Sequence, residues 1–161
     1  MTEATHQRLI VDGLVISKWD RQLFECMRKG GLTAANCTCS IWEGLEDSIK
    51  NLANWKALLK DNEDVVLQVY SIADIERAHR EGRVGIILGW QNSTGFGEYL
   101  PSVRLFHELG IRIVQLTYNT ANMSGFGCYE SRDGGLTDFG RELVLEMNNT
   151  GILVDLSHVG A

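Results

Sequence analysis

The chain has 161 residues, of which 44% are hydrophobic and 22% are charged, and it contains a single proline. This composition is typical of a globular domain and excludes collagen-like, low-complexity and largely disordered proteins. Acidic residues outnumber basic ones by 21 to 15 without any run of lysine or arginine, which disfavours nucleic acid and anionic membrane as partners.

The chain starts with MTEATHQRLIVDG, in which residues 1–7 are predicted to be a flexible N-terminus. This stretch lacks the long apolar core of a secretory signal, and no apolar run in the sequence reaches the ~18 residues of a membrane span. We therefore expect a cytoplasmic protein. Cys37 and Cys39 fit that compartment as small buried thiols, because a zinc site normally needs a second Cys/His pair at matched spacing.

The first predicted elements are a strand at RLIVDGLVI, residues 8–16, and a helix at DRQLFECMRKG. The helix is predicted because Leu23, Phe24 and Met27 would share one face. Further along, SIAD at Ser71–Asp74 resembles a capping box with Asp in place of Glu.

A polar helix, a glycine and an apolar strand follow one another repeatedly along the chain. The four stretches are MRKGGLTAANCTCS, HREGRVGIILGWQN, HELGIRIVQLTYN and MNNTGILVDLSH. The glycine can close the last carbonyls of the helix, and nearly continuous apolar strands are typical of a parallel sheet that is covered on both faces. The pattern predicts an α/β protein with about five β/α units. A short extra strand is expected at VVLQVY, residues 65–70.

The last predicted helix, TDFGRELVLEMNN, places Phe139, Leu143 and Met147 on one face. It leads into the strand GILVDL, after which Ser157 and His158 follow directly.

Polar or unusual side chains follow several predicted strands at their C-terminal ends. In α/β proteins, ligands bind at the carboxyl ends of parallel strands, where loops gather side chains from distant parts of the sequence. A single polar residue at such a place is about as often structural as functional, so the recurrence carries the argument. The residues predicted to line one mouth are Gln91, Asn92, Tyr118, Asn119, Asp155, Ser157 and His158.

The segment GLTDFGRELVLEMNNTGILVDLSHVG, residues 135–160, resembles the membrane dipeptidase (renal dipeptidase) family of the amidohydrolase superfamily. Members of that family share a segment of the form GLTxFGxELVxEMNxxGxxxDLSH. The stretches LFHELGIRIVQLTYN and GRVGIILGWQN are similar to the family's preceding helix and strands, so the resemblance spans residues 8–160.

The resemblance implies a parallel (β/α)₈ barrel of the TIM type with a two-zinc centre that hydrolyses dipeptides. The histidine of the DLSH element binds metal in the family, which gives His158 that role. Because such a barrel takes about 250 residues, residues 8–161 are expected to be the N-terminal part of a metal-dependent hydrolase and the barrel to be incomplete. The family's catalytic aspartate lies downstream, so the catalytic residues stay unknown.

Three departures from the family pattern are expected to change the chemistry of the site. Leu14 and Ile16 stand where the family has a metal-binding His-x-Asp pair, and neither side chain has a donor atom. Gln91 stands at the bridging glutamate, and its neutral amide lacks the charge that holds two dications close together. We therefore expect at most one zinc ion. Tyr118 replaces a substrate-contacting histidine and can still donate a hydrogen bond to a developing oxyanion.

Two functions fit these residues. The first is a dipeptidase-like, metal-dependent hydrolase of small peptides or amides with altered metal ligands, in which Gln91, Asn92, Tyr118 and Asn119 bind substrate and His158 binds metal. The alternative is a non-catalytic, small-ligand-binding or accessory protein on a barrel with a decayed metal site. The first is favoured because it keeps the family chemistry. The expected partner is a small polar substrate such as a dipeptide or amide, with no nucleic acid and no membrane, and a homo-oligomer is compatible with the sequence.

Overall fold

The computed structural model describes residues 8–161 of the chain. The predicted flexible N-terminus, residues 1–7, lies outside the described residues. The chain divides into two compact units, each of which is described by itself. The first contains the residues up to Thr38 together with Ala53–Leu88, and the second contains Cys39–Leu52 and Gly89–Ala161.

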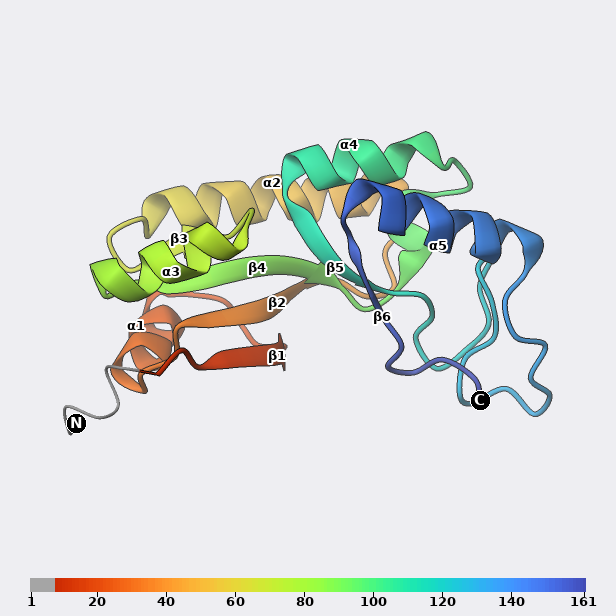
Figure 1. Cartoon of the computed structure of the whole chain (residues 1–161), viewed down its shortest axis with the longest axis horizontal. Helices are drawn as coiled ribbons and strands as arrows, with labels where there is room; N and C mark the ends of the chain where they lie inside the picture. The colour runs from red at the N-terminus through yellow and green to blue at the C-terminus, as the bar shows by residue number, and fades with distance from the viewer. Residues whose placement is uncertain (1–7) are drawn as a thin grey trace. The chain divides into compact units, whose positions relative to one another are not determined.

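Helices and strands alternate along the described chain, as the sequence predicts (Figure 1). The elements in chain order are β1 (Val11–Val15), α1 (Arg21–Lys29), β2 (Ala34–Ser40), α2 (Leu45–Asp61), β3 (Val66–Gln68), α3 (Ile72–Glu81), β4 (Val84–Trp90), the short 3₁₀ helix η2 (Ser93–Phe96), α4 (Pro101–Leu109), β5 (Ile111–Gln115), α5 (Asp138–Thr150) and β6 (Leu153–Asp155).

The strands of the described chain form a 6-stranded sheet in the order β1-β2-β4-β5-β6, with β3 beside β4. The pairs β1 with β2, β3 with β4 and β5 with β6 are all parallel. Parallel strands joined through helices are the arrangement of a β/α barrel, and the fold is that of an incomplete TIM-type barrel. The short strand expected within residues 65–70 is confirmed as β3.

An aromatic cluster forms part of the core of the first unit. The α1 helix begins where the Asp20 carboxylate accepts a hydrogen bond from the Leu23 backbone N–H at 2.8 Å. Its residue Phe24 is fully buried, with its ring 6.2 Å from that of Trp19 between centroids. Trp19 in turn lies 4.9 Å from Trp55. Burial of these large rings is what fixes the helix on the unit.

The α3 helix confirms the predicted capping box. The Asp74 carboxylate accepts the Ser71 backbone N–H at 2.9 Å, and the Ser71 side chain completes the box. The helix ends at Gly82, whose φ of 65° is the left-handed conformation that lets the backbone turn back onto the last carbonyls.

The longest helix, α2, has no counterpart among the elements predicted from the sequence. Its 17 residues bury Ser48, Leu52, Trp55 and Leu59, which recur at the helical spacing of three and four. The signal was therefore present in the sequence. It is weakened because the first of these positions is a polar serine, which shortens the apolar stripe.

The core of the second unit lies between the end of β4 and the helices α4 and α5, which lie side by side (Figure 1). The Trp90 ring lies 5.0 Å from Phe96 and 4.6 Å from Phe106 between centroids. On α5, Leu143 and Met147 are fully buried and Phe139 is half-buried, which confirms the apolar face predicted for this helix.

The two thiols of β2 are buried, as the sequence predicts. Cys39 donates to the Gly89 carbonyl at 3.2 Å, and burial raises the pKa of its thiol to about 12. Among residues 8–161, no helix has both the length and the apolar character needed to cross a membrane.

Candidate functional site

Three of the predicted site residues follow the ends of three strands, and all three belong to the second unit. Gln91 comes directly after β4, Tyr118 follows β5, and His158 follows β6. The ring of Trp90 faces α4 through Phe106, so the alternation of side chains along a strand turns Gln91 toward the opposite face of the sheet. Gln91 is buried there. This is the face that lines the interior of a β/α barrel.

A buried polar network joins the end of β4 to the end of β5. Ser93 Oγ and Asn122 Nδ2 each donate to the Leu116 carbonyl at 2.7 Å. Asn122 Nδ2 also donates to Asn92 Oδ1 at 2.7 Å, and Ser93 Oγ lies 2.7 Å from Ser124 Oγ. The amide oxygen of Asn92 therefore holds the two strand ends together, while its predicted contact with substrate stays a prediction.

Tyr118, Asn119 and His158 come together in space. The rings of Tyr118 and His158 lie 4.4 Å apart between centroids, at an interplanar angle of 31°. Asn119 Oδ1 lies 2.7 Å from His158 Nδ1. An amide oxygen can only accept, so Nδ1 carries the proton and Nε2 presents its lone pair. This is the arrangement in which a histidine binds a metal through Nε2 while a second residue fixes its ring.

Asn119 and His158 also share an uncommon backbone conformation. They are the two non-glycine residues with positive φ in residues 8–161, at 64° and 63°. The carbonyl of His158 is held by the Thr117 hydroxyl at 3.1 Å and by the Cys128 N–H at 3.0 Å. Such conformations cost about 1–3 kcal/mol each and collect at functional sites, where the surrounding structure enforces them.

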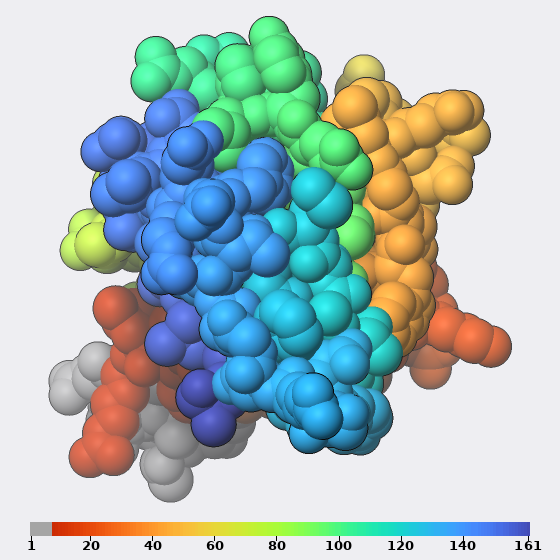
Figure 2. All heavy atoms as spheres, turned by 90° about the vertical axis from the view of Figure 1, so that its right-hand side faces the viewer, coloured from red at the N-terminus to blue at the C-terminus, as the bar shows by residue number. Residues whose placement is uncertain are grey.

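The long connection from β5 to α5, residues 116–137, makes up much of the face of the molecule that Figure 2 shows. Gly127 pairs with Val159, directly after His158, and also touches Asn119. A Cβ atom on Gly127 would lie 2.3 Å from the Asn119 carbonyl carbon, so only glycine fits at this approach. The connection thus supports both halves of the Asn119–His158 pair.

Trp42 is a neighbour of this cluster that the sequence analysis missed. Its ring lies 4.8 Å from that of Tyr118 between centroids, at 86°, in an edge-to-face contact. Trp42 follows the end of β2 by two residues, so the same strand-end argument that selected Tyr118 would have found it.

The two positions at which the resemblance predicts the family's metal pair, Leu14 and Ile16, lie in the first unit. Leu14 and Ile16 are exposed by 37% and 62% and offer no donor atom. Within residues 8–161, no group of three or more His, Cys, Asp or Glu side chains could hold a metal ion. The residues present therefore fit a single metal ligand, His158, and not a complete metal site.

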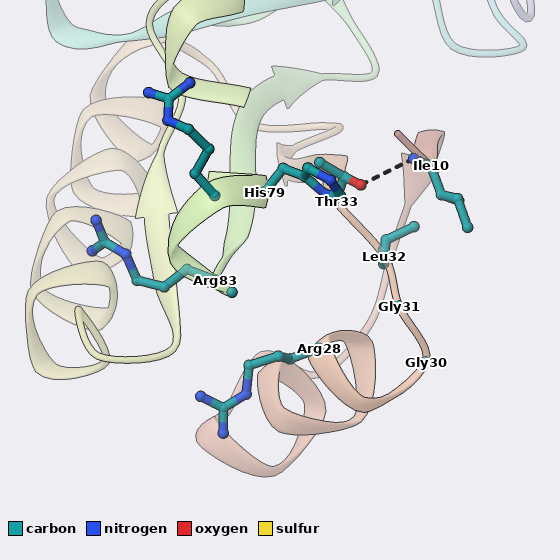
Figure 3. A pocket seen from close by; sticks show the side chains of 10 residues that line it. Ile10, Arg28, Gly30, Gly31, Leu32, Thr33, His79 and Arg83 are labelled. Carbon is teal, nitrogen blue, oxygen red and sulfur yellow. Dashed lines mark hydrogen bonds between the residues drawn. The ribbon is translucent and has the colours of Figure 1, made fainter. Parts of the chain in front are cut away.

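A cavity of about 430 Å³ lies in the first unit (Figure 3). It adjoins Thr33 and Arg83, which directly precede β2 and β4, and the ends of α1 and α3. Arg28 lies on the last turn of α1, and His79 and Arg80 lie on the last turn of α3, where positive charge offsets the negative end of the helix dipole. The guanidinium groups of Arg28 and Arg83 extend away from Gly30 and Gly31 rather than converging. Helix stability accounts for the three residues on the last helical turns, and Arg83 donates a hydrogen bond to the Glu63 carbonyl at 2.7 Å.

Comparison with known proteins identifies relatives over most of the chain. A dipeptidase of Aspergillus oryzae (Dipeptidase aclJ) is 31% identical over 121 residues, which is 73% of this chain and 29% of that protein. An amidohydrolase of Pseudomonas aeruginosa has 52% identity and a TM-score of 0.96, over 99% of this chain and 49% of the solved chain. The chain thus spans half or less of the length of both relatives.

A metallo peptidase of Rhodobacter sphaeroides, solved with a phosphinate mimic of the dipeptide L-Ala-D-Ala, has a TM-score of 0.78 at 18% identity. The match covers 94% of this chain and 59% of the peptidase chain. At this identity it supports the fold alone. The family model of membrane dipeptidase (peptidase family M19) matches residues 21–161. With the strand-end cluster around His158 and the parallel β/α fold, this match shows that the chain belongs to the membrane dipeptidase family.

Proposed function

We propose that this chain is the N-terminal part of a metal-dependent hydrolase that cleaves dipeptides or similar small amides. The family and the fold support a dipeptidase-like activity. The single observation that carries the proposal is the 2.7 Å contact between Asn119 Oδ1 and His158 Nδ1, which leaves Nε2 free for a metal at the carboxyl end of β6.

Zinc or a similar ion is the proposed metal, at no more than one ion per chain. When bound, such an ion polarises a substrate carbonyl and makes a bound water more acidic. Leu14 and Ile16 cannot ligate, and the neutral Gln91 would leave the repulsion between two dications poorly compensated. His158 is the metal ligand that this chain would contribute, and further ligands would come from residues outside it.

The other predicted residues would bind the substrate by hydrogen bonds. The Tyr118 hydroxyl would donate to the oxyanion that develops when the scissile carbonyl is attacked. Asn119 uses its amide oxygen for His158, which leaves its Nδ2 hydrogens as donors for a substrate carbonyl. Gln91 faces the barrel interior, and Asn92 would act chiefly by fixing the loop that follows β4.

The proposed setting is the cytoplasm, which is compatible with four cysteines that all carry free thiols. We propose a small polar substrate as the only class of partner, without nucleic acid or membrane.

The test is hydrolysis of a dipeptide panel by the purified full-length protein, with and without a chelator. We expect release of free amino acids, loss of activity on chelation, recovery with zinc, and a loss of at least about 100-fold in His158→Ala. His79→Ala, which changes a half-buried histidine on α3, should retain activity. Dipeptide binding without turnover would instead support the non-catalytic alternative, and activity indifferent to chelation would refute a metal role.

A further inference from the structure

Trp42 is a large aromatic side chain that the described chain leaves exposed by 61%. Its loop is nevertheless firmly held. Glu43 Oε2 accepts the Ile41 backbone N–H at 2.7 Å, and the Glu43 carbonyl accepts the hydroxyls of Ser48 and Thr94, each at 3.3 Å. The exposure is therefore not the consequence of a loosely attached loop. A fixed, exposed tryptophan at the carboxyl end of a strand is placed to contact a ligand.

The surroundings of Trp42 show which ligand it would contact. Its ring meets Tyr118 edge to face at 4.8 Å, and Tyr118 lies 4.4 Å from His158 between ring centroids. These rings form a continuous row that runs from the exposed Trp42 to the histidine proposed to bind metal. A substrate with its scissile amide near His158 would lay one of its side chains along this row.

We propose that Trp42 is a specificity-determining residue that selects substrates with a large apolar or aromatic side chain over substrates with a small one. The inference rests on the proposed function, because it assumes that the amide is cleaved beside His158. A large side chain buries apolar surface of the indole and gains aromatic contacts, whereas the methyl group of an alanine covers little of it. The row offers no charged side chain, so the preference is for uncharged groups.

The experiment compares kcat/KM of the full-length protein for a dipeptide with phenylalanine or leucine and for the matching dipeptide with alanine. In Trp42→Ala we expect the preference for the large side chain to fall about tenfold, while kcat/KM for the alanine dipeptide changes by less than about twofold. Trp42→Phe should keep most of the preference, because it retains an aromatic ring. Tyr99→Ala, which removes another exposed aromatic residue of the second unit, is the matched control and should leave the preference unchanged.

The outcomes separate this inference from the proposed function. If the wild-type protein hydrolyses dipeptides and Trp42→Ala keeps the wild-type preference, the role of Trp42 is refuted and the proposed function stands. If the wild-type protein hydrolyses none of them, the proposed function fails, and the role of Trp42 is then decided by calorimetric binding of the same two dipeptides to wild type and Trp42→Ala. An equal preference in both proteins would refute it there as well.

Discussion

Asn119 and His158 are linked at the residue scale by backbone conformation and by a side-chain hydrogen bond. Both have positive φ, and the imidazole Nδ1 of one lies 2.7 Å from the amide oxygen of the other. The strained backbone of His158 is held by its carbonyl contacts with Thr117 and Cys128. These constraints fix both the position and the tautomer of the ring before any ligand arrives, which is what a metal-binding histidine requires.

Replacing Asn119 separates its side-chain role from its backbone role. Asn119→Gly should fold at least as stably as the wild type, because glycine adopts positive φ without strain. It should nevertheless lower metal affinity by about 10–100-fold, because His158 loses the acceptor that orients it. Asn119→Asp keeps an acceptor and should retain affinity. Metal titration of the full-length protein checks this, and wild-type affinity in Asn119→Gly would show that the pair has no such role.

The buried thiol of Cys39 is predicted to make the stability of the fold depend on pH. The folded state holds Cys39 with a pKa of about 12, against an ordinary value of 9.0. Between these values the unfolded chain releases a proton that the folded chain keeps, so the stability is full below about pH 9 and falls as the pH rises. We expect urea midpoints to decrease above pH 9, and to decrease less in Cys39→Ala. An equal decrease in both proteins would contradict the assignment to Cys39.

At the scale of elements, the sequence predicted those helices and strands whose signals are local. The Ser71–Asp74 box and the apolar face of α5 are set by residues within one or two turns, and both are confirmed. Helix α2 was missed because the first of its buried positions is the polar Ser48, which shortens its apolar stripe. The compact connection at residues 116–137 could not be predicted, since its hydrogen bonds join residues far apart in sequence, such as Asn122 and Asn92.

Gly140 on α5 tests how closely this connection packs on its helix. Alanine normally stabilises a helix interior by about 1 kcal/mol relative to glycine. Here a Cβ atom would lie 1.8 Å from the Ser124 carbonyl oxygen, so Gly140→Ala should instead destabilise the protein by about 3 kcal/mol. Gly44→Ala, at a position with nothing within 4 Å, is the control and should change stability by less than about 0.5 kcal/mol. Equal urea midpoints for both variants would show that the Ser124 carbonyl does not approach α5 so closely.

At the scale of the whole molecule, the two ends of the strand order expose apolar side chains. In the first unit, Val11 and Leu14 of β1 are exposed by 50% and 37%; in the second, Leu153 of β6 is exposed by 58%. Exposed, apolar edge strands are templates for pairing with another chain. The half-barrel fold thus explains why the strands are parallel and apolar, but leaves edges that residues 8–161 do not cover.

We therefore expect the 161-residue chain by itself to associate at micromolar concentrations. Sedimentation velocity should show species larger than a monomer, and Val11→Lys together with Leu153→Lys should reduce them, because charge on an edge opposes strand pairing. Tyr99→Lys, which changes an exposed residue outside the strands, is the control and should leave the extent of association nearly unchanged. A monomer with a cooperative unfolding transition would contradict the prediction.

The candidate site was predictable in part for the same reason that the fold was. Because ligands bind at the carboxyl ends of parallel strands, the sequence predicted that Tyr118, Asn119 and His158 lie at one end of the sheet. In the structure, His158 contacts both Tyr118 and Asn119. The hydrogen bond that selects the His158 tautomer could not be deduced, because it depends on the positive φ of both residues. The metal ligands that would complete the site are not provided by residues 8–161, so no argument from this chain alone could supply them.

Metal content is the most direct test of the account, since a metal held by His158 is its central claim. Elemental analysis of the purified full-length protein should find no more than one zinc or similar ion per chain, because Leu14 and Ile16 have no donor atom and the neutral Gln91 would leave the repulsion between two dications poorly compensated. His158→Ala should remove that ion, and His79→Ala should retain it. Two tightly held ions per chain, or unchanged occupancy in His158→Ala, would contradict the account.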